Sequence, residues 1–346
     1  MDSQQQTGTT RRRRRAAMSD VGRLAGVSHQ TVSRVINGSQ RVRPETRRRV
    51  LEAMRQLGYR PNLTARALVT GRTRTLGVVS FDTTLYGPAS TLFGIERAAH
   101  EAGYFIVVAS MRGLNRGTVA DAVEHLRLQG VEGILVITPI DDAAEAVLHA
   151  RADVPLVAVE AGPDSALPVV EVDQYAGAEL ATRHLLELGH RTVWHLAGPP
   201  DFIEARSRLE AWRRTLAAAG ALAPAPLTGD WSARSGYELG QRLAAESALS
   251  AVFVANDQMA LGLLRALHEA GRAIPAEVSV VGFDDIPEAA YFVPPLTTVR
   301  QDFNELGSRS LGVLLRMIET GEPGPAAPRV KPRLIVRAST APPPGR

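Results

Sequence analysis

The chain has 346 residues, of which 45% are hydrophobic, so it can bury the cores of two or three domains. It contains no cysteine, which excludes disulfides, thiolate metal sites and cysteine nucleophiles. No apolar run approaches the roughly 18 residues of a membrane span, and no apolar export core follows the arginines at 11–15. We therefore expect a cytoplasmic protein without a membrane partner.

Charge is segregated along the chain. Residues 1–70 carry fifteen arginines against four acidic residues, a net charge of +11, whereas the remainder carries −7 within the overall +4. A basic segment on an acidic body is typical of proteins that bind the phosphate backbone of DNA. A solvated face explains a single arginine run but not a whole segment. Residues 1–17 lack a hydrophobic period and are predicted to be a disordered basic tail.

Residues 18–60 are predicted to form three short helices. In SDVGRLAGVSHQTVSRVING (19–38), a helix over 20–25 ends at a glycine, and Ser28 then offers an N-cap to a helix that runs to about Val35. A third helix opens at Pro44 and closes at Gly58. We interpret this segment as a helix-turn-helix domain.

The second helix of such a motif enters the major groove of DNA. Its exposed positions here are His29, Gln30, Ser33 and Arg34. Glutamine can pair with adenine through two hydrogen bonds and arginine with guanine, so these positions carry groups that read bases. The alternative is a helical hairpin whose polar residues merely face water.

A short helix is predicted over residues 61–71, between Pro61 and Gly71. Helices of fewer than about 12 residues are marginal in water, so this one needs a partner to form. The alternative is an ordinary linker.

Beyond residue 75, apolar runs alternate with amphipathic helices. The predicted strands cover 76–81, 104–109, 133–137, 155–159, 193–197, 251–255, 278–283 and 333–337. The predicted helices cover 88–102, 117–129, 141–150, 174–189, 204–219, 232–247, 257–271 and 304–319. This alternation predicts an α/β body of two doubly wound parallel-sheet subdomains behind an all-α head.

Polar side chains follow several predicted strands. Glu160, Asn256 and Asp284 come directly after strands, Arg206 lies in the first turn of a helix and Trp231 opens another. Ligands of doubly wound sheets bind at the carboxyl ends of the strands. Carboxylates, amides and arginine bind hydroxyls and an indole stacks on a sugar ring, so we expect a saccharide site. Taken singly, these residues are more typical of helix caps, surface ion pairs and core.

No catalytic or cofactor motif is evident. There is no GxGxxG after a strand, no P-loop lysine and no nucleophile elbow, and the His-Glu pairs at 100–101 and 268–269 lack a second histidine. We predict no catalytic residue, no cofactor and no metal site. A secreted sugar-binding protein would share the body but would need an export signal and no DNA-binding head.

Six ordered motifs resemble the lactose-repressor and galactose-repressor family of bacterial transcription regulators. They are DVGRLAGVSHQTVSRVING, GYRPN, LGVV, VANDQMALG, VSVVGFDD and PPLTTVRQDF, and the resemblance spans residues 18–340. It implies a periplasmic-binding-protein-like body and a homodimer that represses transcription from a pseudo-palindromic double-stranded DNA operator. A saccharide effector, galactoside-type, would relieve the repression. A different sugar, or a corepressor, remains the alternative.

The resemblance also implies site residues. The DNA-binding set comprises Ser28, His29, Gln30, Thr31, Ser33, Arg34, Asn37, Asn62, Ala65 and Leu68. Residues 61–68 match a hinge helix that folds on the operator, with Leu68 as a minor-groove wedge. The ligand-binding set comprises Phe81, Pro88, Glu160, Arg206, Trp231, Asn256, Asp284, Gln301 and Phe303.

Domain boundaries and departures follow from the same resemblance. The first subdomain is expected to comprise 74–172 and 301–331, the second 173–300 and 332–341, and the end, 342–346, a disordered tail. Ala17 replaces the usual threonine cap and Gly22 a usual alanine, so the first helix should be weakened unless Ser19 caps it. Phe81 and Phe202 stand where small serines are expected. No leucine heptads follow the body, which favours a dimer over a tetramer.

Overall fold

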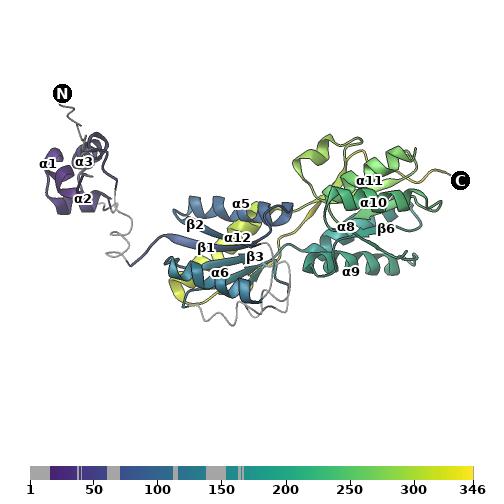
Figure 1. Ribbon diagram of the computed structural model, residues 1–346, viewed down its shortest axis with the longest axis horizontal. Coiled ribbons are helices and arrows are strands. Elements are labelled where there is room, and N and C mark those ends of the chain that lie inside the picture. Colours follow the sequence, from purple (N-terminus) through teal and green to yellow (C-terminus); the bar gives the residue numbers. More distant parts are fainter. Residues whose placement is uncertain are drawn as a thin grey trace, which may run out of the picture. The chain divides into compact units, whose positions relative to one another are not determined.

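The computed structural model describes residues 16–36, 39, 41–60, 71–111, 116–137, 153–162, 165 and 167–345. They belong to two compact units, a head within residues 1–73 and a body over residues 74–346 (Figure 1). Several predictions fall outside the described residues: most of the basic tail, Asn37, the hinge positions Asn62, Ala65 and Leu68, and the helix at 141–150.

Three helices form the head, namely α1 (Met18–Ala25), α2 (His29–Ile36) and α3 (Pro44–Leu57). Val21, Val32 and Val50, one from each helix, are fully buried against one another in a single core. Gly26 ends α1 with φ 65°, a left-handed conformation that a glycine adopts without strain. The head is therefore the predicted helix-turn-helix.

The first turns of α1 and α2 are held by side chains. Ser28 caps α2 as predicted, because its Oγ accepts a hydrogen bond from the Thr31 amide at 3.2 Å. In α1, the Asp20 carboxylate accepts from the Ala17 amide at 2.9 Å. The helix already begins at Met18, so the prediction that Ser19 caps it is wrong, since Ser19 lies inside the first turn.

The first sheet of the body is parallel throughout, in the order β2-β1-β3-β4-β5. Its strands are β1 (Thr75–Phe81), β2 (Phe105–Met111), β3 (Ile134–Ile137), β4 (Leu156–Val159) and β5 (Val169–Val170). Leu135 packs on the side of α5 (Tyr86–Glu101) and α12 (Phe303–Thr320), and Val136 on the side of α6 (Arg116–Leu128). Helices thus cover both faces, as in a doubly wound sheet (Figure 1).

The second sheet has the order β11-β10-β9-β8-β6-β7 and is parallel except for β11 at its edge. Its strands are β6 (Trp194–Ala197), β7 (Leu227–Thr228), β8 (Ala251–Val254), β9 (Ser279–Asp284), β10 (Thr297–Arg300) and β11 (Arg333–Ile335). Its helices are α8 (Gln174–Glu187), α9 (Ile203–Ala218), α10 (Ala233–Ala244), α11 (Asp257–Glu269) and the 3₁₀ turn η1 (Pro287–Tyr291). Val252 packs on the side of α10 and α11, and Phe253 on the side of α8 and α9.

The chain crosses between the two sheets three times, before α8, before α12 and before β11. Val172 and Val330 form a parallel bridge where the first and third crossings run side by side. Gln174 begins α8 directly after the first crossing, and Gln301 lies on the second. Within the described part of the chain, no helix combines the length and apolarity that a membrane crossing requires.

Candidate functional site

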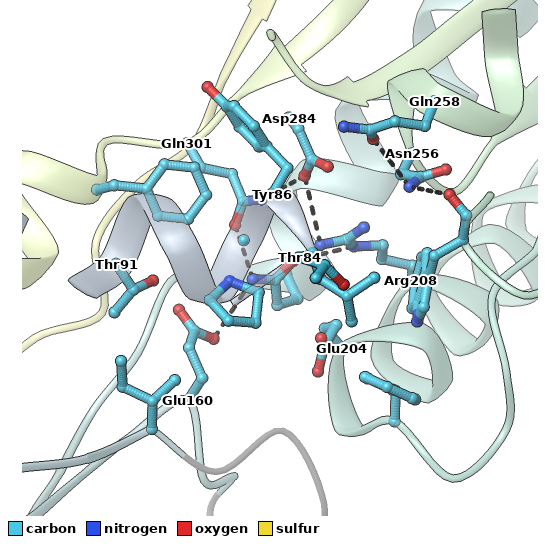
Figure 2. Close-up of a pocket in the computed structure, with 18 of the residues that line it drawn as sticks. Thr84, Tyr86, Thr91, Glu160, Glu204, Arg208, Asn256, Gln258, Asp284 and Gln301 are labelled. Atoms are coloured by element: carbon cyan, nitrogen blue, oxygen red, sulfur yellow. Dashed lines mark hydrogen bonds and ion pairs between the residues drawn. The ribbon is translucent and has the colours of Figure 1, made fainter. Parts of the chain in front are cut away.

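A pocket of about 310 Å³ lies between the two subdomains of the body (Figure 2). The last residues of β3 and β9 and the segments that follow β1, β4, β6, β7 and β8 contribute to its walls, together with the starts of α5, α8 and α12. The site therefore lies at the carboxyl ends of the strands of both sheets, as expected for doubly wound folds.

Seven of the nine predicted ligand residues line this pocket. They come from both subdomains and from the crossing before α12. They are Pro88, Glu160, Trp231, Asn256, Asp284, Gln301 and Phe303.

The structure corrects the choice of arginine. Glu204 and Arg208 are four residues apart, so they share the face of α9 that lines the pocket. Arg206, two residues from each, points about 200° away around the helix. Its Nη1 donates to the backbone carbonyls of Pro200 and Asp201, both at 3.1 Å. Arg208 is thus the arginine of the pocket.

Phe81 is the second residue that the pocket does not include. It ends β1 and packs against Phe202, with ring centroids 6.0 Å apart. Phe202 is the one of the two that lines the pocket. The aromatic wall continues from Phe202 to Trp231, whose ring lies edge-on at 5.6 Å.

Arg208 is the centre of a buried polar network and is only 4% exposed. Its Nε and Nη2 donate to Gln174 Oε1 at 3.0 and 2.8 Å, and its Nη1 donates to the Ala255 carbonyl. Its Nη2 lies 3.9 Å from Asp284 Oδ1, and its guanidinium lies 3.8 Å from the centre of the Phe283 ring. Protein acceptors therefore already occupy all three of its nitrogens.

Two glutamines close this network into a ring. Gln174 Nε2 donates to Gln301 Oε1 at 2.9 Å, and Gln301 Nε2 donates to Asp284 Oδ1 at 2.7 Å (Figure 2). Gln174 begins α8 and Gln301 directly follows β10, so the ring is built from the second subdomain and the start of the crossing that leaves it. The ring meets the first subdomain through Glu160, whose Oε2 lies 3.4 Å from Gln174 Nε2.

Three carboxylates in the pocket have raised pKa values. Burial raises the pKa of Glu160 to about 8, although Glu160 Oε1 accepts from the Val172 amide at 2.9 Å. Burial likewise raises the pKa of Glu204 to about 7. It raises the pKa of Asp284 to about 6, while the charge of Arg208 opposes the shift. Such groups cluster where a protein binds or transforms a ligand.

Backbone strain is concentrated at the same place. Among the described residues, five non-glycine residues have positive φ, and three of them line the pocket. Glu160 has φ 61°, Trp231 has φ 73° and Asp284 has φ 112°. A left-handed non-glycine residue costs about 1–3 kcal/mol and persists where the surroundings over-determine it. The fold thus holds these three side chains in the pocket at a cost in stability.

Trp231 is held from both sides. Its ring packs over Gly198, where an added Cβ would lie 2.2 Å from the indole. Asn256 Nδ2 donates to the Trp231 carbonyl at 3.0 Å, and Asn256 Oδ1 caps α11 by accepting from the Met259 amide at 3.0 Å. Asn256 is therefore both the helix cap that its position suggests and part of the pocket wall.

In the head, the face of α2 that points away from the core is polar. Ser28, His29, Gln30 and Arg34 are exposed, and Thr31 and Ser33 are half-buried beside them. The neighbouring residues Arg41, Arg43, Arg48 and Arg49 are exposed as well. The described part of the head therefore presents hydrogen-bond donors and acceptors on a surface that also carries exposed arginines.

Comparisons with known proteins agree with this geometry. A model of the lacI family of bacterial regulatory proteins matches residues 17–62, and a model of a periplasmic binding protein-like domain matches residues 182–340. The lactose operon repressor of Escherichia coli (strain K12) is 36% identical over 300 residues, which cover 86% of this chain and 83% of that protein. The ribose operon repressor of the same strain is 34% identical over 312 residues, covering 88% and 93%.

A solved structure of the lac repressor dimer, bound to operator and the anti-inducer ONPF, matches with a TM-score of 0.85 at 34% identity. The match covers 95% of this chain and all of that one. The chain belongs to the lacI family of bacterial regulatory proteins. It is a DNA-binding transcriptional repressor of that family and not an enzyme, as its sequence indicates. The predicted fold class is confirmed.

Sequence reasoning missed several pocket residues of this lacI-family repressor. Gln174 and Glu204 look like ordinary polar positions on amphipathic helices, and the spacing of four between Glu204 and Arg208 is the signal that could have paired them. The other missed lining residues include Thr84, Tyr86, Thr91, Asp230, Ser232 and Gln258.

Proposed function

We propose that this repressor binds an operator in double-stranded DNA and that a saccharide, galactoside-type, relieves the binding from the pocket of the body. The observation that carries the proposal is the composition of that pocket. Carboxylates and amides that can bind hydroxyl groups lie beside the indole of Trp231 and the ring of Phe303. Sugar rings need such partners, because their hydroxyls form hydrogen bonds and their C–H faces pack on aromatic rings.

Operator recognition is assigned to the head. In this proposal His29, Gln30 and Arg34 read base edges in the major groove, because they are exposed on α2. Backbone and minor-groove contacts are proposed for Ser28, Thr31, Ser33, Asn37, Asn62, Ala65 and Leu68. Because its proposed partner is DNA, we expect the protein to act in the cytoplasm.

The body supports a homodimer. Strand β2 lies at the edge of its sheet, and its side chains Phe105 and Val108 are 65% and 41% exposed. Phe93 on α5 is 64% exposed. A second copy would cover these apolar groups and would supply a second head for a pseudo-palindromic operator. We expect the Phe105→Asp variant to sediment as a monomer and to bind operator more weakly. A variant that stays dimeric would contradict this interface.

Regulation in this proposal depends on a pocket whose walls come from both subdomains. A saccharide shifts the protein between an operator-binding and a released form only by its differential affinity for the two. Contacts from both subdomains make such a difference available, because the two walls of the pocket move relative to one another when the body closes.

Fluorescence anisotropy with an operator selected from a random DNA pool tests the proposal. We expect the full chain to bind this duplex, and we expect one or more members of a saccharide panel to weaken that binding. A saccharide that strengthens it would instead identify a corepressor. If none of the saccharides changes operator affinity, control by a sugar is wrong.

A further inference from the structure

The pocket contains more acidic than basic side chains. Glu160, Glu204, Asp230 and Asp284 line it, against the single guanidinium of Arg208. Asp284 lies 3.9 Å from that guanidinium. Asp230 accepts hydrogen bonds from the backbone amide and hydroxyl of the adjacent Ser232. Glu160 and Glu204 are left without an ion pair in the described part of the chain.

These two carboxylates come from different subdomains. Glu160 follows β4 and Glu204 lies in the first turn of α9. In the view of Figure 2 both lie on the lower side of the pocket, away from Asp284 and Asn256. Both side chains line the pocket, so one ligand can face the two of them. A group placed between them would contact both subdomains.

Both sides of the pocket also hold polar atoms that still need a partner. Glu204 Oε2 is buried without a hydrogen bond, and so is the indole Nε1 of Trp231, whose side chain is 8% exposed. Glu160 Oε2 has only a long contact of 3.4 Å from Gln174 Nε2. Buried polar groups are nearly always paired in native structures. Glu204 Oε2 and Trp231 Nε1 are covered by protein atoms, so they gain a partner only if the side chains around them move, and Glu160 Oε2 is the atom left with a weak partner.

An anionic ligand does not fit this arrangement. Three of the five N–H groups of Arg208 already donate to Gln174 and Ala255, and the carboxylate of Asp284 lies 3.9 Å from its guanidinium. A phosphate or carboxylate on the ligand would therefore meet two further acidic side chains, Glu160 and Glu204, beside a cation that already has a carboxylate partner. Like charges at this depth are strongly destabilising, because the medium screens them little.

We propose that the effector is an amino sugar whose ammonium group binds between Glu160 and Glu204. This inference rests on the proposed function. An ammonium group has three donors and can serve both carboxylates, whereas a hydroxyl has one. Hydrogen bonds between charged groups are about twice as strong as neutral ones, so the amine is preferred over the hydroxyl it replaces.

Calorimetric titration of the full chain at pH 7, where the amine of an amino sugar is mostly protonated, tests the proposal with matched sugars. The probes are galactosamine, galactose, N-acetylgalactosamine and galactose 6-phosphate, with the corresponding glucose series. We expect an amino sugar to bind about tenfold more tightly than its neutral counterpart. N-acetylation, which removes the charge and keeps the nitrogen, should abolish that preference, and the 6-phosphate should bind most weakly.

Isosteric variants test whether Glu204 and Glu160 cause the preference for amino sugars over neutral sugars. Glu204→Gln should lower the ratio of amino-sugar to neutral-sugar affinity about tenfold. Glu210→Gln, on the exposed face of α9, should keep the wild-type ratio. Glu160→Gln serves as an independent second variant should Glu204→Gln fail to fold.

The outcomes distinguish failure of the amino-sugar assignment from failure of saccharide regulation as a whole. Equal affinity for amino and neutral sugars, or tighter binding of the phosphate, overturns the amine assignment and leaves saccharide regulation standing. If no saccharide binds, in either series, the proposed function fails together with it.

Discussion

Replacing Arg208 by methionine is the sharpest test of the pocket, because Arg206 on the same helix provides a matched control. Arg208 is buried among pocket residues, whereas Arg206 donates to the carbonyls of Pro200 and Asp201 on the outer side of α9. Both substitutions remove one positive charge from one helix. Only their positions relative to the pocket differ.

The magnitude follows from the contacts that are lost. Without Arg208, the carboxylate of Asp284 loses its cation, and Gln174 Oε1 and the Ala255 carbonyl lose their donors. Removing one partner of a buried ion pair costs about 3–5 kcal/mol. Arg206→Met removes hydrogen bonds at the surface, for which we expect about 1 kcal/mol or less.

Urea unfolding and saccharide titration measure the two effects. Arg208→Met should unfold at a much lower urea concentration and lose the saccharide response, whereas Arg206→Met should retain both. Arg208→Lys separates charge from shape, because lysine keeps the charge but lacks the planar fork that reaches Gln174 and Ala255. We expect it to fold better than the methionine variant and to bind saccharide weakly. Similar losses in the Arg206 and Arg208 variants would refute the assignment.

Three further predictions concern other parts of the molecule. Gly198→Ala brings a methyl group against the indole of Trp231, so it should lower the free energy of unfolding by about 1–3 kcal/mol. It should also weaken saccharide binding measured by calorimetry. An unchanged saccharide affinity would contradict the packing of Trp231 on Gly198. Glu160 and Glu204 have raised pKa values, about 8 and about 7, so both are protonated in the folded protein at a pH where the unfolded chain has lost the protons. The free energy of unfolding without ligand should therefore fall as pH rises from about 5 to about 8. The fall should be smaller in the variant that combines Glu160→Gln and Glu204→Gln. A free energy of unfolding that does not change with pH would argue against buried, unpaired carboxylates. Ser28→Ala removes the cap of α2 and should destabilise the head by about 1 kcal/mol, seen as weaker DNA binding with normal saccharide binding.

Much of the architecture could be predicted from local sequence because its causes are local. Gly26 adopts the left-handed conformation that ends α1, and Ser28 caps α2, so the turn of the helix-turn-helix is specified by residues within it. Strands such as β8 and β9 are apolar on both faces, and every residue of each is buried. Those strands were therefore predicted to within a residue or so at each end.

Short strands and the crossings depended on tertiary structure. Strands β5 and β7 have two residues each, too few for a periodic pattern, and they exist because a neighbouring strand pairs with them. Gln174 opens a helix whose sequence is unremarkable. Its role arises because the crossing places its amide between Arg208 and Gln301.

The pocket residues likewise include some that local sequence predicts and some that only tertiary packing places. Residues that follow a buried strand, such as Glu160 and Asp284, were predicted because the carboxyl ends of parallel strands meet at one edge. The sequence by itself determined that α9 begins at this edge with two arginines, Arg206 and Arg208, in its first turns, but not how that helix is rotated about its axis. Packing against the second sheet decides the rotation. It turns Glu204 and Arg208 into the pocket and Arg206 out of it.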